Sequence, residues 1–275
     1  MTLVLPDSSW LALIIGNSRL HWAFFIGEKL CYAWDTQHLP ASVVQQLAQC
    51  RTLDDFPKEL FPFNISAAPP VPPAPPLPLP LYLASVVPSQ TALWQTYPQV
   101  HVITLDQVPL RGIYPTLGID RALALWGAGE TWGLPALVID AGTAITLTGA
   151  DPHNCLFGGA ILPGVKLQLQ SLAQKTANLP LVPTSATLPQ RWALNTSEAI
   201  ASGIFYTLLA GIKDFIEAWR QQFEISYVVL TGGDHALLLQ YLQAQFPTIA
   251  AGVIADPHLI FWGMRSCKRL QEKQS

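Results

Sequence analysis

Two glycine-containing turns are the first places in this sequence where residue types and spacing suggest chemistry. Gly16, Asn17 and Ser18 follow one short apolar segment, and Gly142 and Thr143 follow another. Glycine removes the side chain that would keep a phosphate group away from backbone N–H groups, and the hydroxyls add donors. Either turn alone is weak support, because such pairs are frequent in β-hairpins. Two copies at equivalent positions of similar units favour a phosphate-binding role.

Two further motifs stand at the ends of predicted buried strands in the second half of the chain. Asp140 comes directly before the second turn, where a carboxylate is costly unless it holds a cation or accepts hydrogen bonds. We therefore expect it to be a cation ligand. Thr231, Gly232, Gly233 and Asp234 follow the strand YVVL and precede a helical segment. Such a strand-to-helix junction is suited to packing against a nucleotide.

Asp120 is the candidate acid–base residue. It lies in the motif of Gly118, Ile119, Asp120 and Arg121, which opens a helical segment at 122–126. A capping aspartate is the simpler interpretation, because a helix N-terminus favours a carboxylate. Beside two phosphate-binding turns, however, a carboxylate can orient and deprotonate an attacking hydroxyl. Arg121 could hold a substrate carboxylate with two parallel hydrogen bonds.

The elements that must position these residues repeat along the chain. In the first half, three strands form a meander and are followed by alternating helices and strands: strands at 11–15, 18–26 and 30–34, a helix at 41–49, a strand at 81–87, a helix at 89–97 and a strand at 100–105. The second half returns to this order: strand, turn and strand at 136–149, then strands at 155–162, 228–232 and 251–255.

This repetition predicts a duplicated α/β fold with a cleft between two lobes. We place the N-terminal domain at 1–107 and the C-terminal domain at 108–275. The first domain contains the proline-rich run PPVPPAPPLPLP at 69–80, which can neither pair in a sheet nor continue a helix. A surface loop and a docking motif for a partner are both compatible with that composition.

A long amphipathic helix is expected after Asn195, which forms a capping-box pattern with Glu198. One face is apolar, with Ile200, Ile204, Leu208, Ile212, Phe215 and Trp219 at helical spacing. An adjacent face carries small residues four apart: Ala199, Gly203, Thr207 and Gly211. Small residues let another backbone approach closely, either within the chain or across a homodimer.

Composition narrows the classes of function. Of the 275 residues, 50% are hydrophobic and only 12% charged, which favours a large core and a subunit interface. The apolar segments are interrupted too early to span a membrane, and the first ten residues lack a cationic signal start, so we expect a cytoplasmic protein. A net charge of −3 without a basic block argues against nucleic acid as a partner. The four cysteines have no metal-site spacing and are expected to be ordinary thiols.

The motifs GIDRA, VIDAGTAITL, FGGAILPG, NTSEAIASG and VVLTGGD, in this arrangement, make the chain resemble the type III pantothenate kinase family. The resemblance runs from about residue 11 to residue 265. It implies an actin-like pair of ribonuclease-H-like domains with mixed sheets, and a homodimer. It also implies phosphorylation of pantothenate by ATP and magnesium, the first step of coenzyme A synthesis. A monovalent cation, potassium or ammonium, is a further expected cofactor.

The resemblance also implies roles for particular residues. Asp120 would be the proton acceptor for the pantothenate hydroxyl, and Asp140 would bind the monovalent cation. Pantothenate would contact Tyr114, Gly118, Ile119, Asp120, Arg121 and, from the other subunit or helix, Thr196. ATP would contact Ile14, Ile15, Gly16, Asn17, Ser18, Arg19, Leu20, His21, Gly142, Thr143, Gly232 and Gly233.

Two positions depart from the family pattern. The first motif of the family has an aspartate two residues before its glycine, and Ile14 stands there. That carboxylate normally helps to place magnesium and phosphate. The family's pocket tyrosine falls nearer Arg111 by spacing, and Tyr114 is the tyrosine available. Because Ile14 replaces that aspartate, a regulatory binding protein of the same fold is one alternative to a pantothenate kinase. A kinase for another small hydroxy compound is a second alternative, because the sequence does not show which residues form the walls of the substrate pocket.

Overall fold

The structure, a computed structural model, describes residues 9–50, 57, 60 and 78–274. The chain forms two compact units. The first contains the described parts of Met1–Val108, Thr116–Leu123 and Met264–Ser275, and the second contains Pro109–Pro115 and Ala124–Gly263. Residues 69–77 of the proline-rich run lie outside the described residues. The predicted domain boundary near residue 108 stays a prediction.

The first unit is built on a five-stranded mixed sheet with the order β3-β2-β1-β4-β5. Its strands are β1 (Ser9–Ile15), β2 (Leu20–Ile26), β3 (Lys29–Thr36), β4 (Leu81–Ser85) and β5 (Val100–Val102). The meander β1-β2-β3 is antiparallel, whereas β4 is parallel to both β1 and β5. The central strand β1 is buried along its whole length, as its apolar sequence predicts.

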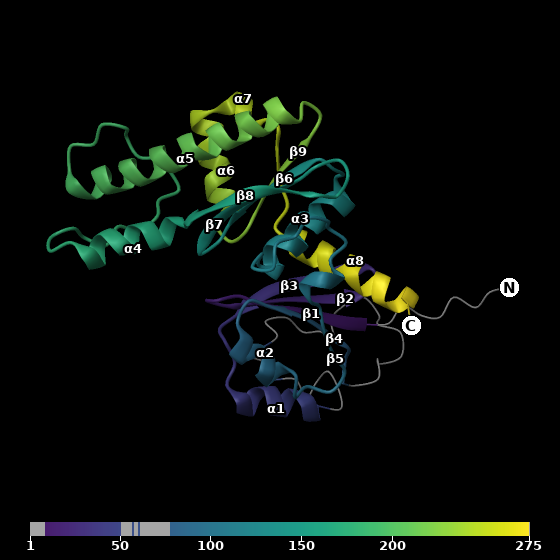
Figure 1. The fold of residues 1–275 in the computed structure, drawn as a ribbon. Coiled ribbons are helices and arrows are strands. Elements are labelled where there is room, and N and C mark those ends of the chain that lie inside the picture. The colour runs from purple at the N-terminus through teal and green to yellow at the C-terminus, as the bar shows by residue number, and fades with distance from the viewer. Residues whose placement is uncertain (1–8, 51–56, 58–59, 61–77, 275) are drawn as a thin grey trace. The chain divides into compact units, whose positions relative to one another are not determined.

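One face of this sheet packs on α1 (Ala41–Gln49) and α2 (Pro88–Trp94), as Figure 1 shows. Alternate residues of β1, such as Leu11 and Leu13, point to these helices. The opposite face meets α8 (Leu259–Gln274), whose Lys268 ammonium lies 5.4 Å from the centre of the Trp10 ring. A short 3₁₀ helix, η3 (Leu105–Gln107), follows β5.

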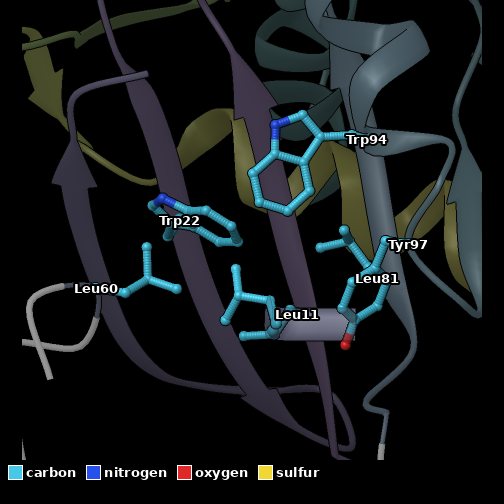
Figure 2. A pocket seen from close by; sticks show the side chains of 7 residues that line it. Leu11, Trp22, Leu60, Leu81, Trp94 and Tyr97 are labelled. Atoms are coloured by element: carbon cyan, nitrogen blue, oxygen red, sulfur yellow. The ribbon is translucent and has the colours of Figure 1, made fainter. Parts of the chain in front are cut away.

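A small cavity remains between the sheet and these two helices. Figure 2 shows its lining, which includes Leu11, Trp22, Leu81 and Trp94. Its volume is about 10 Å³, barely enough for one water molecule, and its apolar lining offers a water no hydrogen-bond partners. It is therefore a packing void of the core and not a ligand site.

The second unit repeats the first. Its sheet has the order β10-β9-β6-β7-β8. Read from the other edge, this is β8-β7-β6-β9-β10, so β6 to β10 take the places that β1 to β5 take in the first unit. The strands are β6 (Ala136–Ala141), β7 (Ala144–Ala150), β8 (Leu156–Pro163), β9 (Tyr227–Thr231) and β10 (Val253–Ala255). The antiparallel and parallel pairings also match. The predicted fold class, a duplicated α/β fold with a mixed sheet of ribonuclease-H-like strand order in each half, is confirmed.

The helices of the second unit are α3 (Ile119–Thr131), α4 (Val165–Lys175), α5 (Thr196–Gln222), α6 (His235–Gln245) and α7 (Pro247–Ala250). α3 begins in the first unit and α8 ends there. Figure 1 shows α4 and α5 extending side by side beyond the sheet of the second unit.

Helix α5 is, among the described residues, the one helix long and apolar enough to cross a membrane, with a mean hydropathy of 1.4. Half of that apolar window is buried inside the protein. Ile200, Ile204, Leu208 and Ile212 belong to the core of the second unit, so core packing accounts for the apolar face. Near the end of the helix the predicted apolar face is wrong by one residue, because Phe215 is exposed and Ile216 is buried in its place.

Two predicted strands end earlier than their sequences suggested. β4 stops at Ser85 because the Ser85 hydroxyl accepts the N–H of Val87 at 3.0 Å and turns the chain. β5 stops at Val102 because Thr104 begins a capping box, in which its N–H donates to Oε1 of Gln107 at 3.0 Å. In both cases a side chain hydrogen-bonds the backbone in competition with the sheet.

Candidate active site

The first predicted phosphate turn joins β1 to β2 in the first unit. The Gly16 N–H donates to the carbonyl of Arg19 at 3.0 Å and closes the turn, while Asn17 and Ser18 are exposed. The flanking residues Ile14, Ile15 and Leu20 are at most 3% exposed. Their side chains belong to the core, so only the turn and the residues beside it present polar groups to a ligand.

His21, at the start of β2, forms a polar cluster with Asp35 of β3. Nδ1 of His21 lies 2.7 Å from Oδ1 of Asp35, and a guanidinium nitrogen of Arg19 lies 3.8 Å from Oδ2. The hydrogen bond from His21 lowers the pKa of the Asp35 carboxyl, and the charges of His21 and Arg19 act in the same direction. Sequence analysis missed Asp35, because only strand pairing brings it beside the turn.

The second predicted turn joins β6 to β7 and is topologically equivalent to the first, since β1 and β6 occupy the same place in their sheets. The Gly142 N–H donates to the carbonyl of Ala144 at 3.1 Å. Thr143 is exposed at its tip, and its carbonyl accepts the N–H of Gly164 at 2.9 Å. The FGGAILPG segment therefore supports this turn from the start of α4.

Asp140 and the motif at 231–234 lie together in the second unit. Gly232 has a φ of +87°, which glycine adopts without strain, and a Cβ there would be only 2.3 Å from Oδ1 of Asp140. The N–H of Asp234 donates to the carbonyl of Ala141 at 2.9 Å, and Lys166 pairs with Asp234 at 3.5 Å. The loop after β9 is thus fixed against the end of β6, beside the second turn.

Asp120 lies in the first turn of α3, in the first unit. Its Oδ1 accepts the N–H of Arg121 at 2.8 Å, and the carbonyl of Gly118 accepts the N–H of Ala122 at 3.1 Å. A Cβ on Gly118 would lie 2.4 Å from the same Oδ1, so glycine leaves room for the carboxylate. Ile119 and Arg121 are buried, at 8% exposed each, whereas Gly118 and Asp120 are partly exposed.

The two remaining predicted substrate residues lie in the second unit. Tyr114 is 41% exposed. Thr196 is exposed in the first turn of α5, directly after Asn195, whose Oδ1 accepts the N–H of Glu198 at 2.9 Å. The predicted N-cap is confirmed. Tyr114, Asp140 and Thr196 therefore belong to one unit, and the first turn and Asp120 to the other.

The described residues contain no group of three or more histidine, cysteine or carboxylate side chains that could hold a metal ion. Magnesium does not require such a cage, because it is commonly bound by one or two carboxylates together with substrate phosphates. In this chain the position of the family aspartate holds Ile14, which is only 3% exposed. The position therefore provides no carboxylate for a metal ion. Asp140 carries carboxylate oxygens, the kind of hard ligand that such cations prefer, and glycine at 232 leaves room for them, because a Cβ there would lie 2.3 Å from its Oδ1.

Comparison with known proteins gives the chain its family. The family model of type III pantothenate kinase matches residues 10–218. A type III pantothenate kinase from Nostoc sp. is 58% identical over 265 residues, which cover 94% of each chain. One from Synechococcus sp. (strain JA-3-3Ab) is 43% identical over 95% of this chain and 93% of its own.

Two crystal structures resemble the chain in fold alone. A conserved protein from Campylobacter jejuni, assigned to the Baf family of transcriptional activators, has a TM-score of 0.62 at 20% identity and covers 96% of this chain and 99% of its own. An ethanolamine utilization protein from Carboxydothermus hydrogenoformans has a TM-score of 0.50 at 9% identity, over 96% and 91%. With the family model and the curated relatives spanning most of its length, the chain belongs to the type III pantothenate kinase family.

Proposed function

We propose that this protein phosphorylates pantothenate with ATP, yielding 4′-phosphopantothenate and ADP, as the first step of coenzyme A biosynthesis. The observation that carries the proposal is the 58% identity to a type III pantothenate kinase over 94% of both chains. The duplicated sheets and their two equivalent glycine turns agree with an enzyme that binds a nucleotide.

Asp120 is the proton acceptor in this proposal. It lies in the first turn of α3, and the hydrogen bond from the Arg121 N–H orients its carboxylate. The carboxylate takes the proton of the primary hydroxyl of pantothenate as that oxygen attacks the terminal phosphorus of ATP. Gly118 contributes by leaving the space that the carboxylate occupies.

The turns at Gly16 and Gly142 hold the phosphates through backbone N–H groups and the nearby hydroxyls of Ser18 and Thr143. Magnesium, when bound with the nucleotide, supplies further neutralisation of phosphate charge. The motif at 231–234 packs against the nucleotide, and the fixed loop geometry around Gly232 supports that role. Asp140, beside the second turn, binds the monovalent cation, potassium or ammonium.

The substrate pocket in this proposal uses Tyr114, Gly118, Ile119, Asp120, Arg121 and Thr196. The exposure of Tyr114 and Thr196 supports their contact with a ligand. Because Ile119 and Arg121 are buried, we expect Ile119 to act through its backbone and Arg121 to act at the wall of the pocket.

We also propose a homodimer that pairs through α5. Among the described residues, no atom apart from the adjacent residues and the neighbouring backbone of α5 lies within 4 Å of the Cβ positions of Gly203 and Gly211, so packing within the chain does not explain the small-residue stripe. Apolar side chains are exposed in the same region, with Trp192 at 86% and Leu194 at 97%. A second copy would cover both features. We expect this dimer to act in the cytoplasm.

The direct test is to incubate the purified protein with ATP, magnesium, potassium and pantothenate, and to identify the product by mass spectrometry. We expect phosphopantothenate that is absent when pantothenate is omitted. The second candidate, a regulatory binding protein, is favoured by the buried Ile14 at the position of the motif aspartate. An intact fold with no product above background would support that candidate, and product from a different alcohol would assign another substrate.

A further inference from the structure

The loop between β9 and α6 contains two consecutive glycines, Gly232 and Gly233. A peptide between two glycines can rotate at low cost, because neither flanking residue has a Cβ. Gly232 packs against the end of β6, since a Cβ there would lie 2.6 Å from the carbonyl carbon of Ala141. Gly233 is exposed, and apart from its chain neighbours no described residue lies within 4 Å of its Cβ position. Within the described part of the chain, the backbone of Gly233 is therefore open to a ligand.

The side chain of His235 holds the carbonyl of this glycine peptide. Nδ1 of His235 lies 2.6 Å from the carbonyl oxygen of Gly232, and the backbone N–H of His235 donates to the same oxygen at 3.2 Å. A carbonyl can only accept, so Nδ1 carries the proton and is the donor. The peptide is trans, so its carbonyl and its N–H point in opposite directions. By fixing the carbonyl of Gly232, His235 also fixes the direction of the Gly233 N–H.

The stability of α6 does not account for this contact. The first N–H groups of a helix need acceptors, and a ring nitrogen that donates cannot supply one. Asp234, at the N-cap of α6, makes no capping hydrogen bond with its side chain, and its carboxylate pairs with Lys166 at 3.5 Å. Its N–H donates to the carbonyl of Ala141 at 2.9 Å. The polar groups of this junction therefore hold the loop in place and leave the helix end uncapped.

We propose that His235 is a positioning residue of the nucleotide site, whose Nδ1–H holds the Gly232 carbonyl so that the Gly233 N–H donates to the bound nucleotide. The ring acts through the peptide and not by contact with the nucleotide. Without it, the glycine peptide rotates between orientations, and only part of the population presents the donor. The inference deepens the proposed kinase function and rests on it only in requiring that ATP binds at the loop after β9.

The test measures the Kd for magnesium-ATP by calorimetry and the KM values for ATP and pantothenate in steady state. His235→Leu keeps a side chain of substantial bulk but has no donor. It should raise the Kd and the KM for ATP by about 3- to 10-fold, the scale of one neutral hydrogen bond. The KM for pantothenate and the melting temperature should stay close to those of the wild type. His235→Ala also removes the donor and replaces the leucine variant if that one folds poorly.

His235→Asn separates the hydrogen bond from the rest of the ring. The amide nitrogen of asparagine stands near the position of Nδ1 and can donate to the Gly232 carbonyl. This variant should therefore bind ATP nearly as tightly as the wild type. A role in packing alone predicts the opposite order, since leucine fills more space with apolar atoms than asparagine does. The matched control is Gln240→Ala, on the exposed side of α6, which should leave the Kd and both KM values unchanged.

NMR tests the hydrogen bond itself. In proton–nitrogen correlation spectra of the wild-type protein, the neutral imidazole of His235 should carry its proton on Nδ1, because the partner of that nitrogen is an acceptor. A neutral ring with its proton on Nε2 would mean that Nδ1 does not hold the carbonyl, and it would overturn the proposal.

The outcomes separate the two proposals. If the wild type binds ATP but forms no phosphopantothenate, the kinase proposal fails while the Kd values still decide the role of His235. If His235→Leu binds ATP as tightly as the wild type, or His235→Asn binds it as weakly as His235→Leu, the positioning role is wrong and the kinase function stands. A KM for pantothenate that rises together with the KM for ATP would also overturn the positioning role. A wild type that does not bind ATP at all would overturn both.

Discussion

At the scale of single residues, the proposed reaction depends most on the carboxylate of Asp120, its proposed proton acceptor. Asp120→Asn keeps the size of the side chain and an oxygen that can accept the Arg121 N–H, but it cannot take a proton. We expect kcat to fall by roughly 100-fold or more, the usual scale for a lost general base, with an unchanged melting temperature. Steady-state assays and thermal unfolding measure the two effects. A kcat close to that of the wild type would contradict the assigned role.

Asp35 gives a pH-dependent prediction for stability. Its pKa is lowered in the folded protein, chiefly by the hydrogen bond from His21, so it stabilises the fold above its unfolded pKa near 3.8. That contribution is lost as the pH falls through the lowered value. Because the pair is half exposed, Asp35→Asn should lower the free energy of unfolding by no more than about 1 kcal/mol at pH 7.

Urea unfolding at pH 7 and at several values below 4 measures this effect. The difference between wild type and Asp35→Asn should shrink toward zero at the acid end. A difference that grows on acidification would mean that the sign of the pKa shift, and the hydrogen bond behind it, is wrong.

At the scale of elements, the start of α5 is fixed by one hydrogen bond from Asn195. Asn195→Ala leaves the Glu198 N–H without that acceptor and should lower the free energy of unfolding by about 1 kcal/mol. Ser197→Ala, one residue inside the first turn of the helix, is the control and should change stability by less than half as much. Equal losses in urea unfolding would show that the cap does not set this helix end.

Local sequence patterns predicted most of the elements. The helix at 41–49 and the three-strand meander are observed at or near their predicted bounds, because alternating apolar residues and turn residues act locally. The ends of β4 and β5 were misjudged because Ser85 and Thr104 form local hydrogen bonds that an apolar run does not show.

The parts that sequence could not provide depend on pairing between distant segments. His21 and Asp35 meet only because β2 and β3 pair in one register. Similarly, α8 contributes to the first unit through contacts such as that of Arg265 with the carbonyl of Glu28. The roles of Asp120 and Asp140 were predicted from residue types and from the family motifs, and those of the other substrate residues from the family motifs. All of these roles stay predictions.

At the scale of the whole molecule, the proposed homodimer makes its own prediction. Gly203→Arg places a long cationic side chain on the small-residue stripe of α5, where a Cβ would meet no described residue within 4 Å apart from the adjacent residues and backbone of the helix itself. We expect the wild type to have twice the 30.0 kDa chain mass by light scattering, and the variant to have the monomer mass with its fold intact. Gln45→Arg, on the exposed side of α1, is the control and should stay dimeric. A dimeric Gly203→Arg variant would place the interface elsewhere.

The measurement that tests the central proposal most directly is the stoichiometry of the reaction. ADP and phosphopantothenate are quantified together while the purified protein turns over ATP with pantothenate, magnesium and potassium. If the chain is a pantothenate kinase, the two products accumulate one to one and both depend on pantothenate. ADP released without phosphopantothenate, or no ADP from a folded protein, would contradict it.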